Sequence, residues 1–270
     1  MQPGMWTSYL IECSLEEMVE RFAEKEWFQL ELSTEHGESL LERGDPAKVG
    51  QEFAQFAVDK GISFPQGHLW LTCDITTDGQ DEMLDLLKKW LDLFAAIGVR
   101  AGVLHPGGNE MRRRNAGAEE IFERQVQVLR QLCEHTRDTG LVISLENVSG
   151  TPEAEDLLAI ITAVGEENLG ICLDTGHLNM ASGDQAGFIR SAGSRLKALH
   201  IADNEGKSDQ HLMPYGRGTV DWGVVMSALK ELPYEGLVNL EIPGENRVPM
   251  EILLAKLDYI KEVMGYMVGK

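Results

Sequence analysis

Short apolar runs alternate with amphipathic segments along the whole chain. Over 80–97, for example, Met83, Leu87 and Trp90 recur at helical spacing, and Gly98 follows as a stop signal. Eight segments share this pattern or carry comparable start and stop signals. Helices are expected over 14–26, 46–60, 80–97, 117–139, 153–164, 184–193, 221–231 and 249–265.

The apolar runs between these helices are continuous rather than alternating, which is typical of strands that are covered on both faces. Eight strand–helix units in 270 residues match an α/β fold of one (β/α)8 TIM barrel, which typically takes ~250 residues. A doubly wound open sheet is the alternative, but it usually carries a glycine-rich loop after its first strand, and 9–17 contains no glycine. No linker divides the chain, so a single domain over 1–270 is expected. Strands are predicted over 5–11, 27–33, 62–71, 99–105, 141–147, 168–174, 196–203 and 236–242.

Composition narrows the class of partner. The formal net charge of −20 disfavours a nucleic acid, because phosphate binding depends on Lys and Arg, and Arg112 to Arg114 form the only basic cluster. The four cysteines contain no CxxC pair, which is typical of free thiols in a reducing compartment. No apolar run approaches the ~18 residues of a membrane span, and no secretion signal is evident. A cytoplasmic protein without a membrane partner is therefore expected, and its oligomeric state stays open.

Imidazole and carboxylate side chains follow six of the eight predicted strands. The carboxyl ends of barrel strands meet at one rim, which is where such barrels place their chemistry. Five of the seven histidines belong to this set, whereas His36 and His135 lie in segments that appear exposed. The set comprises His68, His105, Glu146, Asp174, His177, His200, Asp209, His211 and Glu241.

This combination of side chains is typical of a divalent cation site. Carboxylates and imidazoles without a cysteine suit Zn²⁺, Mn²⁺, Co²⁺ or Mg²⁺. Carboxylates that face one another repel unless a cation or shared protons neutralise them. A bound metal polarises a carbonyl or hydroxyl oxygen of a substrate, and nearby carboxylates are left to move protons. One metal is expected, and the ligand set has room for as many as three.

At these positions the sequence resembles the xylose-isomerase-like barrel superfamily, especially its sugar phosphate isomerases and epimerases. The resemblance rests on "VLHPGG", "ISLENV", "CLDTGHLNM", "LHIADNEGKSDQHLMPYGRGTVDW" and "VNLEIPG". It implies a metal held by Glu146, Asp174, His200 and Glu241. It also implies that Glu146 and Glu241 act as the acid/base pair on a sugar or sugar phosphate through a metal-stabilised enediolate, and that His177 contacts the substrate.

Several further residues are candidates for substrate contacts. Ketose epimerases of this superfamily usually carry an arginine soon after the strand-seven histidine, but here Lys207 is the nearest cation. The resemblance implies that His211 and the turn around Arg217 close the far wall. Glu31 ends the second strand and could bond a substrate hydroxyl, or be a buried structural group, and Trp70 could form a substrate wall. Arg112 to Arg114 would be either a phosphate anchor or a solvated turn.

Two other functions compete with a sugar isomerase or epimerase. The abasic-site endonucleases of the same superfamily bind three metals, and the resemblance maps their larger ligand set onto all nine residues named above. A three-metal phosphodiesterase is therefore an alternative, although the net charge of −20 disfavours DNA binding. A non-catalytic sugar-binding relative is the third alternative.

Overall fold

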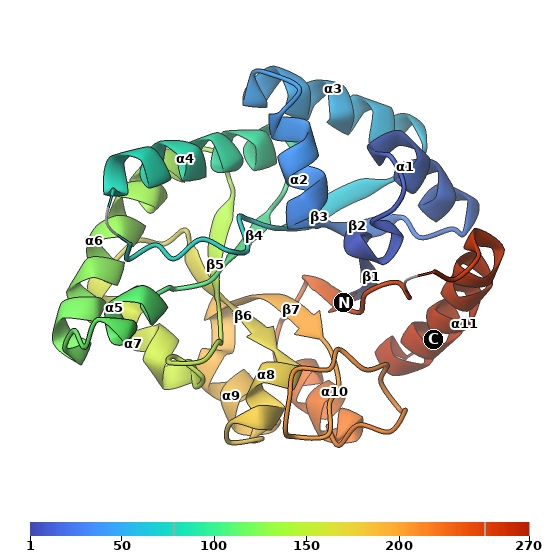
Figure 1. The fold of residues 1–270 in the computed structure, drawn as a ribbon. Coiled ribbons are helices and arrows are strands. Elements are labelled where there is room, and N and C mark those ends of the chain that lie inside the picture. The colour runs from blue at the N-terminus through green and yellow to red at the C-terminus, as the bar shows by residue number, and fades with distance from the viewer. Residues whose placement is uncertain (78, 246, 270) are drawn as a thin grey trace.

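The structure, a computed structural model, describes residues 1–77, 79–245 and 247–269. Its parallel strands close into a barrel in sequence order, with β8 bonded to β1 (Figure 1). The predicted (β/α)8 barrel is therefore confirmed. The strands are β1 (Gln2–Trp6), β2 (Gln29–Leu32), β3 (Ser63–His68), β4 (Ala101–Leu104), β5 (Val142–Glu146), β6 (Leu169–Asp174), β7 (Leu196–Ile201) and β8 (Leu237–Leu240).

Helices surround these strands and bury their apolar faces against them (Figure 1). Trp90 is buried where two helices meet, and Gly37 leaves room for its ring. The helices are α1 (Leu15–Glu24), α2 (Thr34–Leu41), α3 (Pro46–Asp59), α4 (Gln80–Ile97), α5 (Asn109–Arg113), α6 (Ala118–Thr136), α7 (Ala154–Val164), α8 (Thr175–Met180), α9 (Gln185–Ala192), α10 (Trp222–Lys230) and α11 (Met250–Val268).

Local signals set several of the helix ends. The hydroxyl oxygen of Ser14 accepts the backbone N–H of Glu17 at 3.2 Å and caps α1. Gly98 ends α4 with φ 95°, a left-handed conformation that favours glycine. Both ends agree with the helices predicted over 14–26 and 80–97, and α10 likewise runs within the predicted range 221–231.

The predicted first strand over 5–11 is wrong in its bounds. The strand runs from Gln2 to Trp6, and a 3-10 helix, η1 (Thr7–Leu10), follows it. Thr7 turns inward here, and its hydroxyl oxygen accepts the backbone N–H of Ser33 at 2.9 Å. An apolar run with high strand propensity therefore forms a turn, because its polar groups bond to the neighbouring β2–α2 segment.

The expectation that His36 is exposed is also wrong. His36 lies in α2, which was not predicted, and is 4% exposed. Its Nδ1 lies 2.9 Å from the hydroxyl oxygen of Thr7 and 3.1 Å from that of Ser33. His135, by contrast, is exposed as expected.

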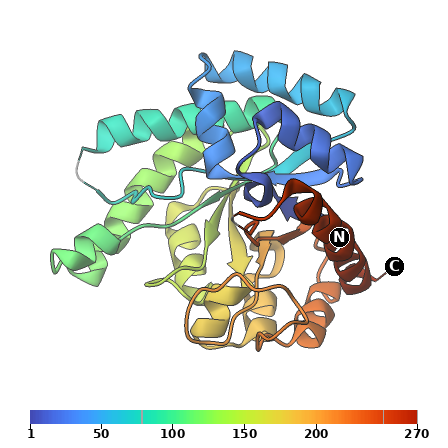
Figure 2. The same ribbon diagram turned by 45° about the vertical axis from the view of Figure 1, so that its right-hand side comes forward.

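The segment between β7 and α10 is a long loop that folds against α8 (Figures 1 and 2). Asp203 holds its base: its backbone pairs with Leu212, and its carboxylate accepts the indole N–H of Trp222 at 3.0 Å. The side-chain amide of Asn179 donates to the hydroxyl oxygen of Thr219 at 2.9 Å. The loop, and with it Asp209 and His211, is therefore anchored at both ends.

The structure can be compared with two expectations from the sequence, which concern the cysteines and membrane-spanning helices. The four cysteines are free and buried. Among the described residues, no helix is both long and apolar enough to cross a membrane.

Candidate metal centre

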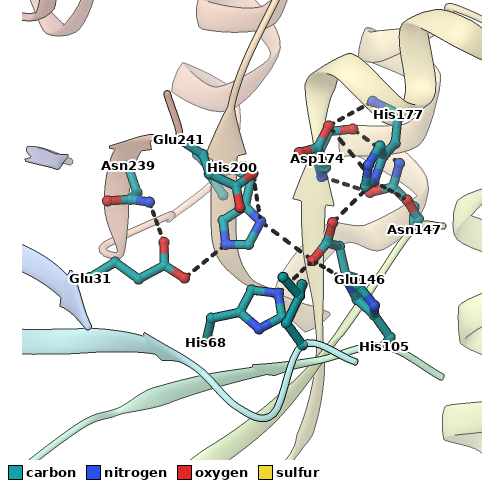
Figure 3. Close-up of polar contacts among 12 residues, drawn as sticks. Glu31, His68, His105, Glu146, Asn147, Asp174, His177, His200, Asn239 and Glu241 are labelled. Carbon is teal, nitrogen blue, oxygen red and sulfur yellow. Dashed lines mark hydrogen bonds and ion pairs between the residues drawn. The ribbon is translucent and has the colours of Figure 1, made fainter. Parts of the chain in front are cut away.

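Five of the predicted ligands converge at the carboxyl-terminal rim of the barrel, and all five are buried (Figure 3). Glu146 lies at their centre, with its Oε2 3.3 Å from Nε2 of His68 and 3.4 Å from Nδ1 of His200. The same Nδ1 atom lies 3.3 Å from Oε2 of Glu241. We call these five residues the inner set: His68, Glu146, Asp174, His200 and Glu241.

The spacing of these atoms fits ligands of one cation. Two ligand atoms that each lie about 2.1 Å from a tetrahedral metal are about 3.4 Å apart. Among the described residues, four atoms of the inner set are buried without a hydrogen-bond partner: Nε2 of His68, Oε2 of Glu146, Oδ2 of Asp174 and Nδ1 of His200. Buried polar atoms are normally satisfied, so this group needs a ligand that the protein itself does not supply. The inner set therefore fits a divalent cation.

Four imidazole rings are oriented so that one nitrogen of each ring could bind a metal. In three of them Nδ1 faces a backbone carbonyl oxygen, which can only accept, so Nδ1 carries the proton and Nε2, which faces another predicted ligand, is the atom that would bind a metal. His200 is the reverse case, because its Nε2 faces a carboxylate and its Nδ1 faces the inner set. The pairs are His68 with Leu69 at 2.8 Å, His177 with Asn147 at 3.0 Å, His211 with Glu241 at 2.8 Å, and His200 with Glu31 at 2.9 Å.

Glu31 lies in the barrel interior beside His200 (Figure 3). Its carboxylate accepts the side-chain amide of Gln66 at 3.0 Å and that of Asn239, in addition to facing His200 at 2.9 Å. Three protein side chains thus surround this carboxylate. The structure places Glu31 behind His200, a candidate metal ligand, and its contacts support the buried role.

The other four predicted ligands form a second group further out. We call His105, His177, Asp209 and His211 the outer set. Oδ2 of Asp209 lies 3.3 Å from Nε2 of His177 and 3.0 Å from Nε2 of His211. Nδ1 of His177 lies 3.0 Å from Oε1 of Glu146, which joins this group to the inner set. All nine residues predicted from the strand ends and the following loops are therefore brought together.

Opposite pKa shifts mark the two glutamates. Burial raises the pKa of the Glu241 carboxyl well above its usual range, although the neighbouring His200 opposes this. Burial acts in the same direction on Glu146, but His200 and His105 outweigh it and hold its pKa well below the usual range. Without a bound cation, one carboxyl is thus biased to hold a proton and the other to lack one, an asymmetry that suits acid/base chemistry.

A cavity of about 960 Å³ reaches the outer set, and none of the described residues that line it belongs to the inner set. His105 and His177 line it, and so does Trp70, which was predicted to form a substrate wall. The segment after β3, α5, the segment after β5 and α8 enclose it. Lys207 and Arg217 are exposed on the loop between β7 and α10, and neither is among the described residues that line this cavity.

Sequence reasoning missed three amide side chains that hold the centre in place. Asn147 joins β5 to β6, since its Nδ2 donates to the carbonyl oxygen of Asp174 at 3.0 Å and its Oδ1 accepts the N–H of Asp174 at 2.6 Å. Gln66 and Asn239 surround Glu31. Each of these amides stands within or directly after an apolar strand. A polar side chain in an otherwise apolar strand needs a buried hydrogen-bond partner, and this requirement was the signal that could have identified it.

Comparison with known proteins assigns the chain to a family. The sequence model of the xylose isomerase-like TIM barrel family matches residues 23–266. The chain belongs to this family. Its curated relatives include an inosose isomerase from Bacillus velezensis, 27% identical over 174 residues and 61% of each protein. A probable endonuclease 4 from Shouchella clausii is 31% identical over 147 residues, 47% of this chain and 48% of that protein.

Solved structures of other proteins have the same barrel fold. A D-psicose 3-epimerase from Clostridium cellulolyticum H10, solved with D-tagatose, superposes with a TM-score of 0.80 over 100% of both chains at 18% identity. At this identity the likeness establishes the fold. The chain spans 49% to 61% of the length of the curated relatives that it matches first.

Proposed function

We propose that the protein is a divalent-metal-dependent isomerase or epimerase of a sugar. One observation carries this proposal: two buried glutamates, Glu146 and Glu241, flank the same imidazole atom of His200 at 3.4 and 3.3 Å. Such a pair places two proton-transfer groups at one point of a rim where barrels of this fold perform chemistry. The family assignment and relatives named inosose isomerase and D-psicose 3-epimerase support a sugar as the substrate.

Four residues of the inner set would hold the metal: Glu146, Asp174, His200 and Glu241. Their oxygen and nitrogen atoms suit Zn²⁺, Mn²⁺, Co²⁺ or Mg²⁺. A bound divalent cation supplies Lewis acidity to a carbonyl oxygen of the substrate. Glu31 would act as a positioning residue, because a carboxylate behind a ligating imidazole fixes its tautomer and its orientation.

The two glutamates would carry the proton transfer. One of them removes the proton from the carbon next to the carbonyl group, which leaves an enediolate. In an isomerisation a proton is returned to the former carbonyl carbon, and the proton of the neighbouring hydroxyl group passes to the former carbonyl oxygen. In an epimerisation the other glutamate delivers a proton to the opposite face of the same carbon. Glu146 ends β5 and Glu241 follows β8, so the two carboxyl groups approach His200 from different parts of the rim. Both reactions are therefore within reach of this pair.

The experiment that tests this proposal follows deuterium from the solvent into the substrate. Metal-loaded protein is incubated in D₂O with a panel of ketoses and inososes, and both deuterium at the carbon next to the carbonyl group and newly formed sugars are measured. We expect exchange in the wild type and in the surface control Glu12→Gln, and its loss in Glu241→Gln. Neither exchange nor a new sugar across the panel would overturn the proposal.

A three-metal phosphodiesterase is the second candidate, because the ligand atoms fall into overlapping groups. Glu146 is shared by two of them, and Asp209 joins His177 to His211 further out. The relative named probable endonuclease 4 agrees with this arrangement, whereas a net charge of −20 opposes DNA binding. Three metals per chain together with nicking of an abasic duplex would favour this candidate. Sugar binding without turnover, unchanged in Glu146→Gln, would favour a non-catalytic relative.

A further inference from the structure

Three consecutive arginines at the end of α5 have different surroundings. Nη2 of Arg112 donates to the carbonyl oxygen of Gly150 at 3.3 Å. Nη2 of Arg114 donates to Oε1 of Glu110 at 3.2 Å. The guanidinium of Arg113 makes no hydrogen bond or ion pair with the described part of the chain, and it is Arg113 that lines the cavity. The basic cluster therefore consists of two arginines with protein partners and one that lines the cavity without a partner among the described residues.

Two carboxylates that line the same cavity as Arg113 already have donors of their own. The carboxylate of Asp74 accepts the backbone N–H groups of Gly108 at 2.9 Å and of Glu110 at 2.8 Å. Glu110 in turn pairs with Arg114. Among the described residues that line the cavity, Arg113 is the only lysine or arginine. An anion that enters this cavity would therefore meet one cationic side chain whose hydrogen-bonding capacity is still available.

The cavity connects this arginine with two histidines of the outer set. Its volume of about 960 Å³ lies at the upper end of the roughly 300–1,000 Å³ that is typical of small-molecule sites. The same cavity is lined by His105 and His177 of the outer set and by Arg113. These two histidines contact Glu146 of the inner set at 3.3 and 3.0 Å, so a molecule that reaches past them to the inner set can extend through the cavity toward α5.

We propose that Arg113 binds the anionic group of an acidic sugar, a phosphate ester or a carboxylate, while the sugar's carbonyl group lies at the inner set. The planar guanidinium matches the oxygens of either group in a bidentate manner. This inference rests on the proposed function and deepens it by naming the substrate class. It also gives a reason for the cationic side chain of Arg113, which has no protein partner among the described residues, in a cavity that reaches the outer set.

Binding measurements on the metal-loaded protein test this role. Isothermal titration compares D-fructose, D-ribulose and D-xylulose with their terminal phosphate esters, and D-fructuronate serves as the carboxylate probe. Charge-assisted hydrogen bonds contribute roughly 1.5–3 kcal/mol, so we expect at least one acidic probe to bind about 10- to 100-fold more tightly than its neutral partner. Arg113→Gln should remove this preference and leave neutral sugars unaffected, and Arg113→Lys should restore part of it. Which acidic probe benefits distinguishes phosphate from carboxylate.

Arg114→Gln is the matched control, because it removes the same charge from the neighbouring position. It should change the affinity for acidic probes less than threefold. Equal binding of neutral and acidic probes by the wild type would overturn the inference, as would equal losses in Arg113→Gln and Arg114→Gln. Acidic probes that bind through Arg113 without any deuterium exchange would sink the proposed function alone. Exchange on neutral sugars that Arg113→Gln leaves unchanged, without an acidic preference, would sink this inference alone.

Discussion

The inner and outer sets differ in how the chain holds them. Side chains of the inner set stand at or next to the ends of barrel strands and are at most 7% exposed. Those of the outer set are 21% to 37% exposed. His105 directly follows β4, His177 lies in α8, and Asp209 and His211 lie in the loop between β7 and α10.

This difference separates a centre that the barrel fixes from a periphery that loops add to it. Ladder hydrogen bonds on both sides set the position of each strand end, and burial strengthens the electrostatic interactions there. The loop that carries Asp209 and His211 depends instead on a few anchors, chiefly Asp203. We therefore expect a cation to bind to the inner set whether or not the outer set is intact. The outer set would decide how many further metals bind.

The largest difference between the inner and outer sets is expected in the effect of substitutions on kcat. Glu146→Gln and Glu241→Gln should each lower kcat by about 10²- to 10⁴-fold, the usual contribution of a positioned acid or base. His211→Gln, in the outer set, should lower it less than tenfold if a single inner metal suffices. Steady-state kinetics on the sugar identified by deuterium exchange provides the measurement. An equal loss in the outer variant would break the distinction between the two sets.

A second test concerns the support behind the inner set. Glu31→Gln should weaken metal binding by about 10- to 100-fold, as is typical when the hydrogen-bond partner of a ligating histidine is altered. Competition against a coloured chelator measures this affinity. Glu38→Gln, on the exposed side of α2, is the matched control and should bind metal like the wild type. Wild-type affinity in Glu31→Gln would show that His200 does not depend on this carboxylate.

His36 provides a buried imidazole outside both sets. Burial lowers its pKa from 6.5 to about 4, although Glu35 opposes the shift. The folded state therefore favours neutral His36, and the stability that this contributes is complete above about pH 6.5 and is lost as the pH falls toward 4. By pH 5 the loss should reach about 2 kcal/mol. Urea unfolding at pH 7 and pH 5 should show this loss in the wild type and a smaller one in His36→Gln. Identical pH dependence in both proteins would contradict it.

The smallest effect is expected for the stability of the metal-free protein. Asp209 is 37% exposed on its loop, so Asp209→Asn should change the free energy of unfolding by less than about 1 kcal/mol. Asp174→Asn, at a fully buried strand end, should have a larger effect, because a neutral amide oxygen accepts the N–H of His177 more weakly than the charged carboxylate does. Thermal unfolding of the two variants compares them directly. A larger loss in Asp209→Asn would reverse the order of the two sets.

The sequence allowed the barrel and the ligand set to be predicted together. Once the alternating pattern indicates eight parallel strands, topology alone brings their carboxyl ends to one rim, and the ligands need no further information. Elements of five to eight residues, such as α5 and α8, escaped because they are too short to show a helical period. The burial of His36 escaped for the same reason, since α2 was not predicted.

Contacts across the barrel interior could not be predicted in the same way. Glu31 faces His200 because the register of β2, β3 and β8 places Gln66 and Asn239 beside it, and that register is set only when the barrel closes. Likewise, Arg112, Arg113 and Arg114 are identical in the sequence. Only the turn of α5 decides which of them reaches the cavity.

Anomalous diffraction from crystals soaked in Mn²⁺ tests the central claim most directly, when the wild type is compared with the Asp209→Asn/His211→Gln double variant. The account predicts a peak at a coordination distance of about 2.0–2.2 Å from side-chain atoms of Glu146, Asp174, His200 and Glu241 in both proteins, whether or not the outer set holds a further cation in the wild type. A cation bound only between His177, Asp209 and His211 in the wild type, or no cation in the double variant, would contradict it.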